Sequence, residues 1–162
     1  MSGSGDRVRE TAKKVAIGLS SSRPGGWLFT HVLYRIDLPL MRLTKGRARI
    51  GLTMPHVVLT TTGARSGKSR SVPLLYTRDG AAFVLIASNG GSKQHPGWYH
   101  NLVANRSATV EIDGMAIACI SREADGPERE RLWAGATASY PGYDAYQKRA
   151  GREIPVMVLE PD

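Results

Sequence analysis

Two Asp-Gly pairs, Asp79-Gly80 and Asp113-Gly114, each lie between two runs of apolar and β-branched residues. An Asp-Gly pair in that setting favours a tight hairpin turn, so each pair predicts two adjacent antiparallel strands. With two further runs of the same kind, we predict six strands, at residues 56–62, 71–78, 81–88, 108–113, 116–122 and 154–160. Pro73 lies early in its strand, which predicts an edge strand or a bulge. Hairpin connections without regular alternation of strand and helix favour a small antiparallel barrel, α+β in class and mainly β.

Two helices are expected to flank these strands. The first covers residues 95–105, and the second begins near Asp125 and runs toward Tyr140-Pro141. Pro127 at an early helical position and Glu128 three residues after Asp125 are typical of the start of a helix. We therefore expect short helices at the side of the sheet and not between parallel strands.

We predict two parts: an N-terminal segment at residues 1–50, either helical or flexible, and a barrel domain at residues 51–162. In the first segment, apolar residues recur at helical spacing, and Arg23-Pro24-Gly25-Gly26 separates two such stretches. The segment can pack on the domain, or it can lie on an anionic membrane as a basic amphipathic helix. No secretory signal and no apolar run of about 18 residues is visible, which predicts a cytoplasmic protein, free or peripheral on the inner face of the cell membrane.

Charge and cysteine content exclude several classes of protein. The chain has 22 Lys and Arg against 14 Asp and Glu, with a net charge of +8, and the excess lies before residue 79. A basic half predicts an anionic partner, which nucleic acid, a membrane surface or a phosphorylated or polycarboxylate ligand can provide. A single cysteine excludes an internal disulfide and a cysteine-rich zinc module, and the four histidines lack metal-binding spacing, so no metal site is predicted.

A glycine-rich loop, Thr62-Gly63-Ala64-Arg65-Ser66-Gly67-Lys68-Ser69, follows the first predicted strand. Three residues separate its glycines where a nucleotide-binding phosphate loop has four, and a strand follows where that loop needs a helix. A nucleoside triphosphatase is therefore excluded. The loop still places Arg65, Lys68 and Arg70 close together, so it can bind a phosphate or carboxylates, or it can be a solvated hairpin tip.

Three tyrosines, Tyr140, Tyr143 and Tyr146, recur at a spacing of three residues. On a helical turn they would form one aromatic face. Their hydroxyls could donate a hydrogen bond or a proton to a substrate, and the alternative is a half-buried aromatic seam in the core.

Four motifs in order give a more specific indication. They are Leu-Thr-Thr-Thr-Gly-Ala-Arg-Ser-Gly-Lys-Ser-Arg at residues 59–70, Pro-Leu-Leu-Tyr at 73–76, Ala-Ser-Asn-Gly-Gly at 87–91 and His-Pro-Gly-Trp-Tyr-His-Asn-Leu at 95–102. In this combination the chain closely resembles the deazaflavin-dependent nitroreductase family of actinobacteria, over about residues 56–160.

The resemblance implies a split β-barrel in which reduced coenzyme F420 transfers a hydride to a quinone, a nitroaromatic or an activated enone. The cofactor carries a phosphate and an oligoglutamate tail, which gives the basic loop a purpose. The implied cofactor-binding residues are Arg65, Ser66, Lys68, Arg70, Ser71, Val72, Pro73, Leu74, Leu75, Ile86, Ala87, Ser88, Asn89, Trp98, Tyr99 and Asn101. The implied catalytic residues are Ser88, Tyr140, Tyr143 and Tyr146, with Ser88 and Tyr140 as candidates to bind the acceptor oxygen or supply a proton.

Other functions stay open from the sequence. The same fold could bind or carry F420 without efficient turnover, or bind FMN in its place. A third alternative is a basic protein that binds membranes or nucleic acid, although no nucleic-acid-binding motif appears and no nucleic acid is expected as a partner. The expected partners are a small acceptor such as menaquinone and a second copy of the chain in a homodimer.

Overall fold

The structure is a computed structural model that describes residues 55–162. The segment predicted at residues 1–50 lies outside the described residues. The strands are β1 (His56–Thr62), β2 (Ser69–Leu75), β3 (Thr77–Asp79), β4 (Ala82–Ile86), β5 (Ser107–Ile112), β6 (Met115–Glu123) and β7 (Val156–Pro161). The helices are the short 3-10 helix η2 (Asn89–Gly91) and the α-helices α4 (Gly97–Ala104), α5 (Gly126–Ser139) and α6 (Gly142–Ala150).

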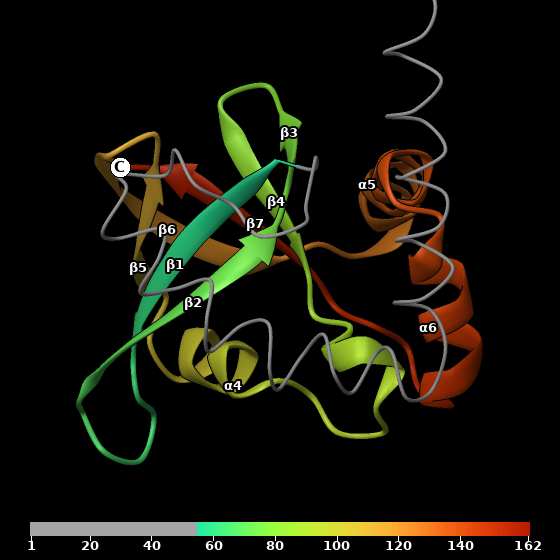
Figure 1. The fold of residues 1–162 in the computed structure, drawn as a ribbon, viewed down its shortest axis with the longest axis horizontal. Helices are drawn as coiled ribbons and strands as arrows, with labels where there is room; N and C mark the ends of the chain where they lie inside the picture. Colours follow the sequence, from blue (N-terminus) through green and yellow to red (C-terminus); the bar gives the residue numbers. More distant parts are fainter. Residues whose placement is uncertain (1–54) are drawn as a thin grey trace, which may run out of the picture.

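All of these strands belong to one antiparallel sheet, in the order β2-β1-β5-β6-β7-β4-β3. The sheet is strongly curled, with α4 below it and with α5 and α6 together at one side (Figure 1). The predicted class, an α+β fold that is mainly β with a curled antiparallel sheet of the split-barrel type, is confirmed.

The strand predicted at residues 71–78 is two strands, so residues 55–162 contain seven strands and not six. β2 pairs with β1, whereas β3 pairs with β4 at the other end of the sheet order. Tyr76 is the single residue between them, and there the chain leaves one edge of the sheet and joins the other. Because the sheet curls, this step brings the two edges toward each other.

Both predicted hairpins are confirmed. β3 pairs with β4, and β5 pairs with β6, each across a two-residue loop. In the second loop Asp113 and Gly114 have positive φ angles of 51° and 80°, as a type I′ turn requires. β2 is the edge strand that Pro73 predicted.

The start of α5 differs in detail from the prediction. Pro127 does lie in the first turn, but the Asp125 side chain makes no capping hydrogen bond. Glu128, which was expected to complete the cap, accepts hydrogen bonds from Arg122 instead. An ion pair to the sheet has therefore replaced the local capping interaction.

The end of α5 also corrects an expectation. Tyr140 has an extended backbone, with φ −139° and ψ 93°, and it lies between α5 and α6. Tyr143 and Tyr146 lie on α6. The prediction that the three tyrosines share one helical turn is therefore wrong for Tyr140, because Pro141 follows it and disfavours helical geometry at that position.

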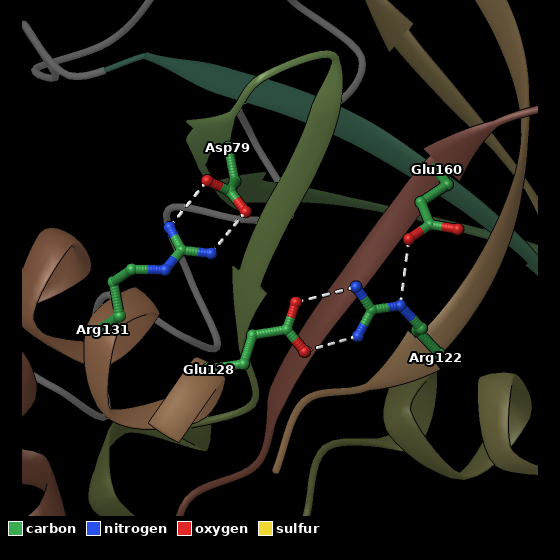
Figure 2. Close-up of polar contacts among 5 residues, drawn as sticks. All are labelled: Asp79, Arg122, Glu128, Arg131 and Glu160. Atoms are coloured by element: carbon green, nitrogen blue, oxygen red, sulfur yellow. Dashed lines mark hydrogen bonds and ion pairs between the residues drawn. The ribbon is translucent and has the colours of Figure 1, made fainter. Parts of the chain in front are cut away.

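Two arginines fasten α5 to the sheet (Figure 2). Arg122 on β6 donates to both carboxylate oxygens of Glu128 at 2.6 and 2.8 Å, and to Glu160 on β7 at 3.0 Å. Arg131 on α5 donates to both oxygens of Asp79 on β3 at 2.8 Å. These bonds hold the pKa values of Asp79 and Glu128 below their ordinary values.

The buried apolar side chains form two clusters. One lies between the sheet and α4 and includes Phe83, Trp98 and Leu102. The other lies between the sheet, α5 and α6 and includes Leu132 and Ile154. In the part of the chain that the structure covers, no helix has the length and hydropathy needed to cross a bilayer.

Candidate functional site

A cavity of about 1190 Å³ lies among the β1–β2 loop, β2, η2, α4 and the tyrosines near α6. Most of the residues that the sequence predicted for a site line it. They are Arg65, Ser66, Arg70, Ser71, Val72, Leu74, Leu75, Ile86, Ser88, Asn89, Trp98, Asn101, Tyr140, Tyr143 and Tyr146. Segments that are far apart in the sequence therefore meet around one space.

Four predicted site residues do not reach the cavity wall. Lys68 is exposed on the β1–β2 loop, and Pro73 and Ala87 are buried. Tyr99 donates a hydrogen bond to the Glu123 carboxylate at 2.9 Å. The structure thus places these four beside the cavity and not around it.

One side of the cavity is basic, and we call Arg65, Ser66 and Arg70 its cationic wall. Arg65 and Ser66 lie in the β1–β2 loop, and Arg70 lies on β2 just after it. All three are exposed. Two guanidinium groups in such positions can bind phosphate or carboxylate groups through charge-assisted hydrogen bonds.

The β1–β2 loop owes its shape to two glycines. The Gly63 amide donates to the Lys68 carbonyl at 2.8 Å, and the Gly67 amide donates to the Gly63 carbonyl at 2.8 Å. A Cβ atom on Gly63 would lie 2.6 Å from Oγ of Ser66 and 3.1 Å from the Lys68 carbonyl oxygen, so a larger residue would force these groups to shift. Gly67 has φ +65°, which glycine adopts without strain.

An apolar strip leads away from the cationic wall along β2. Arg70 and Leu75 both line the cavity and are five residues apart on the strand, which corresponds to roughly 17 Å. Val72 and Leu74 lie between them, and Trp98 adds a buried aromatic ring from α4. A flat, partly apolar ligand fits such a strip.

The opposite side of the cavity is aromatic, and we call Tyr140, Tyr143 and Tyr146 its tyrosine wall. These side chains are only 5–7% exposed and belong to the core beside α5 and α6. The hydroxyls of Tyr140 and Tyr146 are hydrogen-bonded at 2.9 Å, and the rings of Tyr140 and Tyr143 pack edge to face at 5.0 Å. A side chain on Gly142 would overlap the Tyr140 ring, which explains the glycine there.

The segment from Ser88 to Gly91 forms the wall between β4 and α6. Ser88 is buried and lines the cavity. Asn89, Gly90 and Gly91 all have positive φ, and a Cβ atom on Gly91 would lie 3.0 Å from Cα of Tyr146. Small residues here therefore allow η2 to pack closely on α6.

Arg152 holds this segment in place. Its guanidinium donates to the carbonyls of Lys93 at 3.2 Å, Gln94 at 3.2 Å and Ala87 at 3.4 Å. Arg149 adds a bond to the Gly90 carbonyl at 3.3 Å. Neither arginine has a role that the sequence predicts, since nothing local in the sequence connects them with residues more than 50 positions earlier.

Several residues that line the cavity were not predicted. They are Thr61, Gly63, Ala64, Gly90, Gln94, His95, Pro96, Gly97 and His100.

His95 stacks on Tyr99 with ring centroids 4.7 Å apart, and its Nδ1 is buried without a hydrogen-bond partner among residues 55–162. Burial lowers the pKa of His95, and Arg152 and His100 act in the same direction. His95 lies in a motif that carried the family resemblance, which was the available signal.

The order of these surfaces defines what the cavity can hold. It runs from two arginines along an apolar strip to a pair of hydrogen-bonded hydroxyls. This arrangement fits a long ligand with an anionic arm and a flat ring, with an oxygen-bearing acceptor near the tyrosines. Residues 55–162 contain no cluster of three or more His, Cys, Asp or Glu side chains that could hold a metal ion.

The proteins that this chain is similar to agree with a cavity for such a ligand. The sequence model of a family described as F420H(2)-dependent quinone reductase matches residues 33–161. An F420H(2)-dependent quinone reductase of Mycobacterium tuberculosis is 37% identical over 141 residues, which cover 82% of this chain and 95% of that protein.

Solved structures give the same result. A structure described as an F420-H2 dependent reductase (FDR-A) is 39% identical with a TM-score of 0.61, and the match covers 68% of this chain and all of the other. A second structure, described as a domain-swapped dimer, is 36% identical with a TM-score of 0.63, over 78% of this chain and 97% of that one. The resemblance to F420-dependent reductases is thereby confirmed, with F420 as the family's cofactor. The chain belongs to the F420H(2)-dependent quinone reductase family.

Proposed function

We propose that this chain binds reduced coenzyme F420 in the cavity and catalyses transfer of a hydride from it to a quinone. The observation that supports the proposal is the order of the surfaces around the cavity. Arg65 and Arg70 come first, the apolar strip follows, and the hydrogen-bonded hydroxyls of Tyr140 and Tyr146 come last. The polyanionic tail of F420, its flat ring and the carbonyl group of a quinone match these surfaces in the same order.

The cationic wall would hold the anionic arm of the cofactor. Arg65 and Arg70 present ten guanidinium N–H donors between them, and both are exposed toward solvent and the cavity. Binding through exposed arginines is electrostatic and weakens as the salt concentration rises. The free enzyme would thus attract F420 by its charge before the ring enters.

The apolar strip would orient the ring and keep water away from it. Val72, Leu74 and Trp98 present carbon surface, and Ile86 and Leu75 extend this surface toward the tyrosine wall. When it is bound, reduced F420 supplies the hydride. The protein contributes orientation and a water-poor site, which raise the rate without a covalent role for any residue.

The tyrosine wall would supply hydrogen bonds, and a proton, to the acceptor oxygen. The hydroxyls of Tyr140 and Tyr146 are hydrogen-bonded to each other at 2.9 Å, and a tyrosine hydroxyl can both donate and accept a hydrogen bond. Reduction of a quinone by a hydride needs one proton at oxygen, which the hydroxyl of Tyr140 or that of Ser88, both in the cavity lining, would deliver.

The proposal is tested by titrating the protein with F420 and with FMN at matched salt, followed by steady-state oxidation of reduced F420 with menadione. We expect saturable binding selective for F420 and enzyme-dependent oxidation. Selective binding without turnover would favour a carrier of the cofactor, and selectivity for FMN would overturn the cofactor assignment. A nitroaromatic and an activated enone, run beside menadione, measure the breadth of acceptors that the sequence predicted.

Membrane contact and a homodimer complete the proposal. The basic segment at residues 1–50 is expected to hold the protein at the membrane, where menaquinone resides. Sedimentation with anionic vesicles should therefore be lost in a variant that begins at about residue 45.

The similar structure described as a domain-swapped dimer supports a dimer, which light scattering during size-exclusion chromatography would detect.

A further inference from the structure

Asn101 is predicted above to contact the cofactor, yet both polar ends of its side chain are engaged within the protein. Its Oδ1 accepts a hydrogen bond from the Ala64 amide at 2.9 Å, and its Nδ2 donates to Oγ1 of Thr61 at 3.0 Å. Asn101 lies on α4, Thr61 on β1 and Ala64 in the β1–β2 loop. One side chain therefore joins three elements at the edge of the cavity.

The bond to Thr61 makes this junction firm. Thr61 is 3% exposed, so its hydroxyl cannot turn to bulk water for a partner. A buried hydroxyl without a hydrogen bond is unfavourable, which favours a fixed orientation of the Asn101 amide. With Nδ2 fixed on Thr61, Oδ1 is held in position to accept from Ala64.

The bond to Ala64 acts on the cationic wall. Ala64 immediately precedes Arg65, and within residues 63–68 the other described bonds, such as those of the Gly63 and Gly67 amides, close the loop on itself. The hydrogen bond from the Ala64 amide to Asn101 connects this loop to α4. The direction in which the loop projects thus depends on Asn101.

We propose that Asn101 is a positioning residue, which holds the β1–β2 loop so that the cationic wall is already arranged before an anionic ligand binds. Its contribution comes through the loop and not through contact with the ligand. A loop that is ordered in advance loses less conformational freedom on binding, so affinity rises. The identity of the ligand rests on the proposed function, whereas the ordering of the loop is a property of the free protein.

The test begins with hydrogen exchange in the protein without cofactor. The amides of Gly63 and Gly67 report on the order of the loop, because their acceptors lie within it. In Asn101→Ala, we expect both to exchange about tenfold faster, and F420 to bind about fivefold to tenfold more weakly. Asn105→Ala is the matched control: it lies at the end of the same helix, accepts from the Ser107 amide at 3.0 Å and does not line the cavity.

A second variant keeps the test decisive if Asn101→Ala folds poorly. Thr61→Val retains the shape of the side chain and removes the hydroxyl, so it should change the exchange of the same two glycines in the same direction but less. The double variant Thr61→Val, Asn101→Ala should exchange these two amides at about the same rate as Asn101→Ala alone, since both residues act on one junction.

The outcomes separate the two proposals. Unchanged exchange at Gly63 and Gly67 in Asn101→Ala, with weaker F420 binding, would overturn the positioning role and make Asn101 a direct contact. Faster exchange in a protein whose wild type binds no F420 would support the positioning role and overturn the proposed function.

Discussion

The cationic wall and the tyrosine wall face the same cavity but are built in opposite ways. Arg65 and Arg70 are exposed on a hairpin whose loop belongs to neither core cluster. Tyr143 and Tyr146 are almost fully buried and form part of the core beside α5 and α6. Substitutions on the first wall should therefore change binding and leave the fold intact, whereas removal of a ring from the second wall should destabilise the fold.

The largest expected effect is on the stability of the tyrosine wall. Tyr143→Ala removes a buried ring that packs against Tyr140 and Trp133, so the free energy of unfolding should fall by about 3–5 kcal/mol. Arg65→Ala, on the exposed wall, should change it by less than about 0.5 kcal/mol. Urea unfolding followed by circular dichroism measures the free energy of unfolding of both variants. Equal losses in the two variants would contradict the difference between the two walls.

The next effect is on binding at the cationic wall. The double variant Arg65→Ala, Arg70→Ala should bind F420 at least about tenfold more weakly, and its affinity should depend less on salt than that of the wild type. Lys148→Ala removes a cation from α6, away from the cavity lining, and serves as the control. An unchanged affinity in the double variant would refute the anion-binding role.

A smaller effect should separate chemistry from packing in the tyrosine wall. Tyr140→Phe keeps the ring and removes the hydroxyl that pairs with Tyr146. We expect kcat with menadione to fall about tenfold while F420 binds as before. Tyr76→Phe, which lies outside this cavity, is the control. Unchanged turnover in Tyr140→Phe would remove this hydroxyl from the mechanism.

The smallest expected effect concerns the ion pairs of α5 (Figure 2), which are partly exposed and serve the fold. The pKa values of Asp79 and Glu128 lie below their ordinary values of 3.8 and 4.5. As the pH falls, the unfolded chain takes up protons first, so their contribution is present above those values and is lost in more acidic solution.

Urea midpoints measured from about pH 6 to about pH 3 test this, with Arg131→Ala beside the wild type. Removing Arg131 should lower the midpoint slightly near pH 6 and make the acid dependence shallower. An identical acid dependence in the two proteins would show that the Asp79–Arg131 pair does not contribute.

Local chemistry explains what could be predicted from the sequence. The turn at Asp113-Gly114 follows from two residues that tolerate positive φ, and the edge position of β2 follows from a proline that cannot donate a hydrogen bond. The family resemblance then indicated many of the residues that line the cavity, because motifs from distant segments were considered together.

What the sequence did not predict depends on contacts between distant residues. The break at Tyr76 arises because β2 and β3 pair with different strands, which the continuous run at residues 71–78 does not reveal. Arg152 holds carbonyls from Ala87 to Gln94, and Asn101 holds Ala64. Backbone carbonyls and amides carry no sequence signature, so neither role was visible before the structure.

The position of β7 in the sheet has a consequence for synthesis of the protein. Among the strands within residues 55–162, β7 lies between β6 and β4 and is the one that links the group β2-β1-β5-β6 to the hairpin β4-β3 through the hydrogen bonds of the sheet. It also follows the other six strands of this sheet in the chain. On the ribosome the two groups must wait for this last strand, with β4 and β6 each left with an open edge. The nascent chain is therefore most prone to aggregation just before residues 156–161 emerge, and a chaperone bound to those edges would protect it.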